Sequence, residues 1–236
     1  MKKRSKKYAE NRKKVAENKK YSYSEALKLL LEMNRSKFDE TMDVGIRLGA
    51  DPKQSDQQVR GAVVLPHGVG KSVRVVVITK GEKEKEAQDN GADFVGNQDI
   101  IEKIQGGWLE FDKLITTPDM MGSVSKLGKV LGPKGLMPNP KLGTVTFEIG
   151  NAVKNEKKGK VEFRMDKTAN LHTVIGKASF GYEKLKENFE ALLEAIIKQK
   201  PSSAKGAFLR TVAVSSTQSP GITIDVSSLN KDILHE

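Results

Sequence analysis

Hydrophobic residues follow two different patterns along this chain. Between residues 41 and 48 every second residue is apolar, which predicts a strand with one face in a core and one face in water. The run VRVVVI at 73–78 is almost entirely apolar and β-branched, as expected for a strand that is covered on both faces. The chain therefore contains both an antiparallel, one-sided kind of sheet and a parallel, fully buried kind.

Helical and strand periodicities divide the chain into short elements. Between residues 73 and 131 strands and helices alternate, which indicates a small parallel sheet of the Rossmann type. Before and after that segment the pattern is antiparallel, and the strands at 160–166 and 172–177 are expected to pair around the turn DKTAN. The expected helices are a polar one within 3–20 and others after Ser22 and at 82–90, 99–105, 120–131 and 182–200. The expected strands are 41–48, 59–65, 73–78, 94–95, 114–115, 160–166, 172–177, 208–214 and 222–226.

These patterns predict an α+β fold with two domains. A discontinuous antiparallel α/β sandwich is expected to contain residues 1–67 and 160–236, with the first 20 residues as a basic arm or helix. A Rossmann-like α/β domain, residues 68–159, is inserted into it. The chain would cross between the domains twice, and glycines at both crossings suggest a hinge. The expected hinge residues are His67, Gly68, Lys158 and Gly159.

The charge distribution indicates the kind of partner. The 236 residues carry a net charge of +11, from 41 Lys and Arg against 30 Asp and Glu. Ten basic and two acidic residues lie in the first 20, so this arm holds +8 and the rest of the chain +3. A basic arm attracts phosphate backbones, although a solubilising tail or a membrane-surface tail has a similar composition. Specific recognition must then come from shape and from a few placed groups on the nearly neutral body.

Composition excludes several classes of protein and site. The chain has no cysteine, which excludes disulfides, thiolate nucleophiles and zinc–thiolate sites and fits a reducing cytosol. No apolar run approaches the roughly 20 residues that span a bilayer. No apolar segment follows the basic N-terminus, so a secretory signal is not expected either.

Two loops resemble phosphate-binding motifs only in part. The segment GVGKS at 68–72 lacks the first glycine of a phosphate-binding loop, because Leu65 stands in its place, and a strand is expected after it instead of a helix. A domain crossover that needs flexible glycines is the better interpretation. The loop LGPKGLMPNPKLG at 131–143 could hold a phosphate with its amides and lysines, or it could be a rigid surface turn. The sequence leaves both interpretations open.

No catalytic or metal-binding arrangement is recognisable. His67, His172 and His235 lie far apart in the sequence and show no metal-ligand spacing. None of them stands near a serine in a nucleophile-elbow context. We therefore expect a protein that acts by binding, not an enzyme, with no cofactor and no metal.

Five segments together resemble the bacterial-type family of ribosomal protein L-one, the stalk proteins of the large ribosomal subunit. They are KFDETMDVGIRLG (37–49), SDQQVRGAVVLPHGVGKSVRV (55–75), LGPKGLMPNPKLGTVT (131–146), FRMDKTANLHTVIGKASF (163–180) and LKENFEALLEAI (185–196). The likeness runs from about residue 4 to residue 226. The split architecture of that family agrees with the discontinuity inferred above.

The resemblance implies a function and a set of partners. Such proteins are structural constituents of the large subunit that bind 23S rRNA directly at the mobile stalk and aid the release of deacylated tRNA from the exit site. They also repress translation of their own operon mRNA by binding a mimic of the rRNA site. The protein is therefore expected in the cytoplasm, within the large (50S) subunit beside other large-subunit components, with no membrane partner, and as a monomer when free.

Carried over residue by residue, the resemblance implies an RNA-binding face on the discontinuous domain. Neutral hydrogen-bonding groups in a fixed geometry suit folded RNA, which is recognised by shape, 2′-hydroxyls and phosphates. The RNA-binding residues implied are Lys37, Phe38, Glu40, Thr41, Arg164, Asp166, Lys167, His172, Ser216, Thr217, Gln218 and Ser219. Gln218 and Ser219 replace the Met-Gly that usually follows this threonine in the family, so the last turn and the messenger contact are expected to differ.

Structural and functional alternatives accompany this interpretation. Phe38 could be an ordinary core residue, and Asp166 could serve only as the cap of its turn. A nucleotide-dependent enzyme built on the central α/β segment is the first alternative function. A free translational repressor that does not reside on the ribosome is the second.

Overall fold

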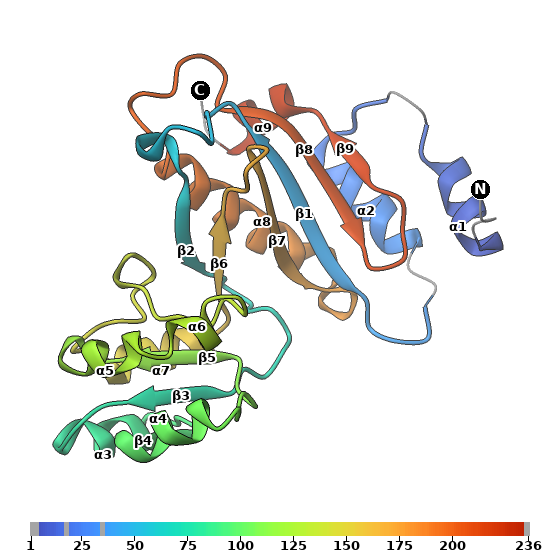
Figure 1. Ribbon diagram of the computed structural model, residues 1–236. Helices are drawn as coiled ribbons and strands as arrows, with labels where there is room; N and C mark the ends of the chain where they lie inside the picture. The colour runs from blue at the N-terminus through green and yellow to red at the C-terminus, as the bar shows by residue number, and fades with distance from the viewer. Residues whose placement is uncertain (1–4, 17–18, 34–35, 234–236) are drawn as a thin grey trace. The chain divides into compact units, whose positions relative to one another are not determined.

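The computed structural model describes residues 5–16, 19–33 and 36–233, and Figure 1 shows the course of the chain. The chain divides into two compact units. Unit 1 comprises residues 1–70 and 161–236, and unit 2 comprises residues 71–160.

The described part of the basic arm forms a short helix. This helix, α1, spans Lys6–Lys14, and the Ser5 side chain caps it by accepting a hydrogen bond from Tyr8 N at 3.3 Å. The buried Asn11 amide donates to the carbonyl oxygen of Met33 at 3.0 Å. Residues 1–4 and 17–18 of the predicted arm lie outside the described residues.

Unit 1 is built on a four-stranded antiparallel sheet in the order β7–β1–β8–β9. The central strand β1, Thr41–Leu48, pairs with β7, Asn170–Lys177, on one side and with β8, Leu209–Ser216, on the other. The edge strand β9, Ile222–Ile224, pairs with β8. The sheet therefore joins strands from the two ends of the chain, as the predicted discontinuity requires.

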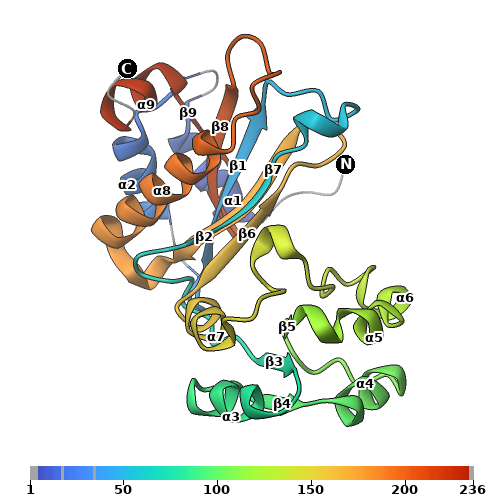
Figure 2. The ribbon, with the colours of Figure 1, turned by 90° about the vertical axis from the view of Figure 1, so that its left-hand side faces the viewer.

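Helices cover one face of this sheet (Figure 2). They are α2, Tyr23–Met33, and α8, Gly181–Lys198, with α9, Val226–Ile233, after the last strand. The apolar alternation of β1 points toward them, and α8 contributes a stripe of buried residues spaced three or four apart, such as Leu185, Phe189 and Ile196. Each such buried side chain stabilises the fold by about 1.5–3 kcal/mol.

The opposite face of the sheet, called the open face below, carries the alternate residues of the strands. Its residues are Thr41, Asp43, Gly45 and Arg47 of β1, Asn170, His172 and Val174 of β7, and Thr211, Ala213 and Ser215 of β8. All of them are half-buried or exposed, and most are small or polar. The one-sided pattern of residues 41–48 thus produces a flat polar face.

Two strands form a separate pair in unit 1. β2, Arg60–Val64, pairs with β6, Lys160–Arg164, so the expectation that β6 pairs with β7 around DKTAN is wrong. At that turn Asp166 N donates to Asn170 O at 2.8 Å. From there β7 departs to extend the β1 sheet, because that pairing places its apolar residues, among them Leu171, in the core under the sheet.

Unit 2 contains a three-stranded parallel sheet in the order β4–β3–β5. Its strands are β3, Val75–Ile78, β4, Phe94–Gly96, and β5, Lys113–Thr116. Every residue of β3 is buried, because Val76 packs into one apolar cluster and Val77 into another on the opposite face. The apolar run at 73–78 predicted this arrangement, and the predicted α+β fold class is confirmed.

Helices cover both faces of the unit 2 sheet. α3, Glu82–Asp89, and α7, Ile149–Lys157, contribute to one apolar cluster, and α4, α5 and α6 contribute to the other. The last three span Gln98–Gln105, Met121–Ser125 and Gly128–Leu131. Short 3-10 turns elsewhere in the chain are η1, Ser55–Gln57, η2, Pro118–Met120, η3, Pro140–Leu142, and η4, Ala178–Phe180.

Two helices of unit 2 differ from the prediction. The single helix expected at 120–131 is broken into η2, α5 and α6, in a stretch where Gly122 and Gly128 lower the helix propensity. The helix α7 was missed, although Ile149, Ala152 and Val153 recur at helical spacing and are buried.

Candidate RNA interface

The start of β1 and the end of β8 lie side by side and hold five of the implied RNA-binding residues together. We call these residues, Glu40, Thr41, Ser216, Thr217 and Gln218, the Thr217 cluster. The strand register pairs Met42 with Ser216. One step further, Thr217 N donates to Thr41 O at 3.1 Å, and Thr41 N donates to Thr217 Oγ1 at 3.1 Å. The sheet ladder thus continues into the loop and fixes the position of Thr217.

Glu40 lies beneath this loop, with only 2% of its surface exposed. Its carboxylate accepts hydrogen bonds from the hydroxyls of Ser36 and Ser216 and from Gln218 N, the last at 3.1 Å. Burial alone would raise the pKa of Glu40, but the hydrogen bonds from Ser216, Ser36 and Gln218 outweigh it and hold the pKa below its ordinary value. An ionised Glu40 therefore supports the loop from inside, and RNA would meet the groups above it.

The two residues that depart from the family pattern close the last turn with their own side chains. Gln218 Oε1 accepts a hydrogen bond from Ser36 Oγ at 3.0 Å. Ser219 Oγ accepts from Ser216 N at 2.8 Å, and Ser219 N donates to Ser216 O at 3.2 Å. Ala169 is the one non-glycine residue with positive φ among the described residues, so Ser219 takes an ordinary backbone conformation where the family has glycine.

The segment before β1 presents an exposed aromatic ring beside the Thr217 cluster. Phe38 is 50% exposed, which contradicts its alternative interpretation as a core residue, and Lys37 is exposed as well. Asp39 anchors the segment, because its carboxylate accepts from Ser179 N at 3.0 Å and from Ser179 Oγ at 2.7 Å. These bonds lower the pKa of Asp39. An exposed ring on an anchored loop can stack on an unpaired base.

Sequence reasoning missed several residues that organise this end of the sheet. Lys177 Nζ donates to Thr41 Oγ1 at 2.8 Å, and Ala178 N donates to Glu40 O at 2.9 Å. Ser36, Asp39 and Ser179 complete the supporting bonds described above. The signal was present in part, since ASF at 178–180 belongs to the segment 163–180 that carried the resemblance, but only the strand pairing brings it to β1.

Three other implied residues lie at the opposite end of β1. Arg164, Asp166 and Lys167 are exposed and stand at or beside the turn between β6 and β7. The register pairs Asn170, next to this turn, with Arg47, whereas Lys177 pairs with Thr41. Six residues of strand separate the two ends, roughly 20 Å at about 3.4 Å per residue. The structure therefore does not bring these residues together with Phe38 and Thr217.

Asp166 organises its own turn. Its carboxylate accepts from Asn170 N at 2.7 Å, from Thr168 N at 2.8 Å and from Thr168 Oγ1 at 2.8 Å. The hydrogen bond from Asn170 N is the main reason why the pKa of Asp166 is lowered. Asp166 thus caps its turn, while Arg164 and Lys167 are exposed.

His172 lies between the two groups on the open face. It is exposed and pairs with Gly45 in the middle of β1, and a Cβ atom on Gly45 would lie 3.5 Å from His172 Nδ1. Asp43, two residues earlier on β1, is partly buried, and this burial raises its pKa in spite of Lys177 and His172 nearby. The open face thus connects the two groups through a surface with few charges.

The predicted hinge residues are held within their own units. Asn188 of α8 accepts from His67 N at 3.0 Å and donates to Gly68 O at 3.0 Å, so both residues are fastened to unit 1. Lys158 is the C-cap of α7, and Gly159 follows it with a φ of 96° in unit 2. A hinge on the first crossing would therefore begin after Gly68.

The two loops that resembled phosphate sites have local structural explanations. GVGKS leads through residues 73 and 74 into β3, as expected for a crossover. In the loop 131–143, Asn139 N donates to Thr144 Oγ1 at 2.7 Å and Lys141 N donates to Asn139 Oδ1 at 2.8 Å. These bonds close the loop on itself and favour the rigid-turn interpretation.

Within residues 5–16, 19–33 and 36–233 no group of three or more His, Asp or Glu side chains is placed to hold a metal ion. In the same ranges no helix is both long and apolar enough to cross a bilayer.

Fold and surface together define a class: a mixed α+β protein in which a discontinuous antiparallel sheet presents a polar face and a parallel α/β unit is inserted into the chain. The chain belongs to the Ribosomal protein L1p/L10e family, whose model matches residues 30–220. It is 61% identical over 220 residues to the large ribosomal subunit protein uL1 of Bdellovibrio bacteriovorus, covering 93% of this chain and 94% of that protein. The family resemblance found in the sequence is confirmed.

Proposed function

We propose that this protein is a structural constituent of the large ribosomal subunit that binds 23S rRNA directly at the mobile stalk. The Thr217 cluster is the observation that carries the proposal. There, a buried carboxylate fixes a loop of hydroxyl and amide groups beside the exposed ring of Phe38. Preorganised neutral groups of this kind recognise folded RNA by shape and hydrogen bonding.

Binding to a stem fragment of 23S rRNA tests this proposal. Phe38→Ala removes a ring on which a base can stack, and we expect a loss of about 1–3 kcal/mol in binding free energy. Phe147→Ala is the matched control, because Phe147 is 53% exposed against 50% for Phe38 but belongs to unit 2. Equal affinities of the two variants, measured by filter binding, would contradict the proposed interface.

Thr217→Val provides a second, independent variant. The substitution keeps the side-chain shape and removes the hydroxyl that accepts from Thr41 N. Selectivity for the rRNA stem over a scrambled stem should fall, because the fixed hydrogen-bonding group is lost. Removal of residues 1–20, which carry +8, should mainly reduce the salt dependence. If the truncated protein lost its selectivity while Thr217→Val kept it, the arm would be the source of selectivity. That result would contradict the roles assigned here.

The same surface would bind one further RNA, the operon messenger, while exit-site tRNA is served by movement of the stalk. The protein aids release of deacylated tRNA from the exit site, and it represses its own operon mRNA by binding a mimic of the rRNA site. Because the mimic uses the same groups, free rRNA stem should displace the messenger, and Phe38→Ala should relieve repression in a coupled translation assay. Repression that persists in the presence of excess stem would argue against a shared surface.

Residence on the ribosome separates this function from that of a free repressor. The protein, cytoplasmic and a monomer when free, should sediment with large (50S) subunits, among the other large-subunit components, in a lysate at moderate salt. High salt should release it, because phosphate contacts weaken as salt rises. A protein found only in the light fractions, yet still repressing its messenger, would favour the free repressor.

A further inference from the structure

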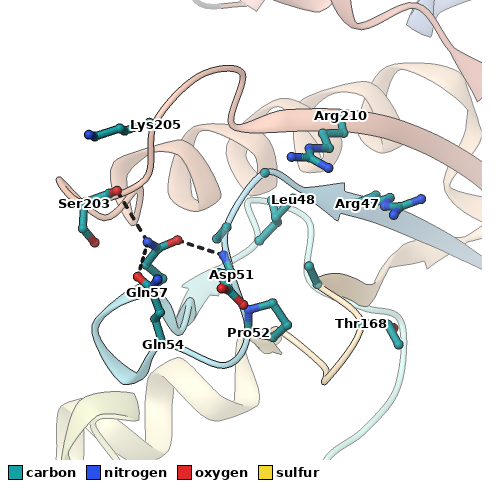
Figure 3. Close-up of a pocket in the computed structure, with 13 residues that line it drawn as sticks. Arg47, Leu48, Asp51, Pro52, Gln54, Gln57, Thr168, Ser203, Lys205 and Arg210 are labelled. Atoms are coloured by element: carbon teal, nitrogen blue, oxygen red, sulfur yellow. Dashed lines mark hydrogen bonds between the residues drawn. The ribbon is translucent and has the colours of Figure 1, made fainter.

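A cavity of about 630 Å³ lies at the end of β1 remote from the Thr217 cluster (Figure 3). Three cationic side chains line it: Arg47 on β1, Arg210 on β8 and Lys205 on the loop before β8. Asp51 is the one carboxylate among the lining residues, so the lining carries three positive charges and one negative charge, a net +2. None of the four is among the RNA-binding residues that the resemblance implied, although Arg47 lies in the segment 37–49 that carried it.

A β-bulge places one of these arginines. The register pairs Arg47 with Thr211 and the next residue, Leu48, with Leu209, which leaves Arg210 without a partner on β1. Such a bulge re-aims the side chain of the extra residue. As a result Arg210 and Thr211 are both exposed, whereas a regular strand would turn one of them into the core.

The loop that carries Lys205 is held closely against the end of β1. Gly49 N donates to Phe208 O at 2.7 Å, and a Cβ atom on Gly49 would lie only 2.1 Å from Ala207 O. Only glycine permits this approach. On the other side the buried Gln57 accepts from Asp51 N at 2.8 Å and donates to Ser203 O at 3.5 Å (Figure 3). The cavity is thus built by packed backbone and a buried amide.

The positive charge in this cavity is not neutralised within the described chain. Arg47, Lys205 and Arg210 form no ion pair with any of its residues. Asp51 is engaged locally, since its Oδ1 accepts from Lys53 N at 3.0 Å. Guanidinium groups present forked donors that match the oxygens of a phosphate. An anion with phosphate geometry is therefore the ligand that suits the cavity.

We infer that this cavity binds a backbone phosphate of the same RNA that the Thr217 cluster holds. The inference rests on the proposed function and extends it to a second contact. Arg47 is on the open face, six residues along β1 from Thr41 and roughly 20 Å away, so one folded RNA lying along this face reaches both ends. The Thr217 cluster then provides specific recognition, and the cavity provides a sequence-independent contact that fixes the RNA's orientation.

Salt dependence tests the contact. The double variant Arg47→Gln/Arg210→Gln removes two positive charges from the cavity. The control Lys184→Gln/Lys198→Gln removes two exposed charges from α8, which covers the other face of the sheet. The plot of log affinity against log salt should flatten by about 0.7–0.9 in the first variant, the change expected for one lost phosphate contact, and should stay parallel to wild type in the control.

The selectivity of the same variant gives an independent readout. Arg47→Gln/Arg210→Gln should weaken the rRNA stem and a scrambled stem by similar factors, because a phosphate contact carries no sequence information. Circular dichroism should show the same melting temperature as the control variant. A slope and an affinity equal to those of the control would overturn the inference.

A tethered cleavage reagent locates the RNA directly. The chain has no cysteine, so Lys205→Cys creates a single attachment point for an iron chelate that cuts nearby RNA backbone. In a mixture of rRNA stem and tRNA we expect strong cuts in the stem, and no cuts from the same reagent on Lys198→Cys. Cuts in tRNA alone would show that a different RNA occupies the cavity and would overturn the inference.

Failure of the inference and failure of the proposed function give different results. If wild-type protein does not bind the rRNA stem, the proposed function fails before the cavity is tested. If wild type binds, Phe38→Ala weakens binding, and the cavity variants behave like their control, the cavity inference alone fails. Inorganic phosphate at millimolar concentration should leave the selectivity for the rRNA stem unchanged in both the wild type and the cavity variant. The reason is that the cavity supplies only one of many contacts.

Discussion

Ser216 donates a hydrogen bond to the carboxylate of Glu40, although 176 residues separate them in the chain. Both side chains are buried, and the strand pairing of β1 with β8 brings them together. The loop that holds Thr217 therefore takes its shape from a residue that precedes the first strand. Neither chain segment could form this surface alone, so the proposed RNA interface depends on closure of the discontinuous unit.

Glu40→Gln should destabilise the protein and weaken RNA binding together. Three donors converge on the carboxylate, namely the hydroxyls of Ser36 and Ser216 and the amide of Gln218. The glutamine NH2 group cannot accept any of them, and a buried donor left unsatisfied costs about 1–3 kcal/mol. Urea unfolding measures this loss. Glu194→Gln, on the exposed side of α8, is the control and should change stability by less than about 0.5 kcal/mol.

The same carboxylate should make stability depend on acid pH. The pKa of Glu40 is lowered from its ordinary value of 4.5, since the hydrogen bonds outweigh the effect of burial. A depressed pKa in the fold means that the unfolded chain takes up the proton first as pH falls. The stabilisation is complete above about pH 5 and disappears as pH falls through the folded pKa. The gap between wild type and Glu40→Gln in unfolding free energy should therefore shrink below that pH, and a constant gap would contradict this account.

Local patterns predicted the parts of the fold that local burial decides. The alternation at 41–48 predicted a strand covered on one face, and the apolar run at 73–78 predicted a strand covered on both. The burial of the two strands confirms both predictions. The partner of the strand at 160–164 was predicted wrongly, because pairing is decided by distant segments that compete for the same edges. The break in the helix expected at 120–131 had a local signal in its glycines, but the signal was weak.

The site was predictable in composition and much less so in arrangement. The resemblance supplied Phe38, Glu40 and Thr217, and the structure brings these three to one end of the sheet. It supplied Arg164 in the same set, but that residue stands beside the β6–β7 turn, and Asn170 next to this turn pairs with Arg47 at the opposite end of β1. A sequence motif carries residue identities, whereas the distance between two motifs follows from strand register, which depends on the whole sheet.

Asp43→Asn should stabilise the protein at neutral pH. Partial burial raises the pKa of Asp43, and Lys177 and His172 offset this only in part. A raised pKa means that the fold disfavours the ionised form, so the penalty is present at neutral pH and disappears as pH falls through the folded pKa. Asparagine removes it, with a gain below about 1 kcal/mol because the site is partly solvated. Thermal melts should show the gain at pH 7 and none near pH 3.

Asp43→Asn also tests whether RNA lies along the open face. Asp43 is a negative group on β1 between the Thr217 cluster and the Arg47 cavity, two residues from Thr41 and four from Arg47. Its removal should tighten stem binding by a few fold at low salt, since like-charge repulsion with phosphate is relieved. Unchanged or weaker binding, with the stability gain intact, would mean that RNA does not lie along this face.

Ser219→Gly, which restores the usual family residue, should destabilise this chain. Ser219 Oγ accepts the Ser216 amide at 2.8 Å, and glycine would lose that acceptor and loosen the turn. The expected cost is about 1 kcal/mol in unfolding free energy. Ser219→Ala separates the two causes, because it removes the hydroxyl but keeps the backbone restraint. Equal stability of all three proteins would show that the hydroxyl has no structural role in the turn.

We propose that the two units, residues 1–70 with 161–236 and residues 71–160, fold as separate domains, with the hinge beyond the anchored Gly68. The paired strands β2 and β6 lie next to the two cut ends in the sequence, and Met165 N donates to Val59 O at 2.9 Å at the end of the pair remote from the cuts. A short glycine linker from residue 70 to residue 161 should therefore leave one cooperative unfolding transition. Stem affinity should stay within about threefold of wild type, because the Thr217 cluster and the Arg47 cavity lie wholly in unit 1. Phe38→Ala in the shortened protein is the control. A shortened protein that folds but binds the stem no better than this control would show that unit 2 contributes to the interface.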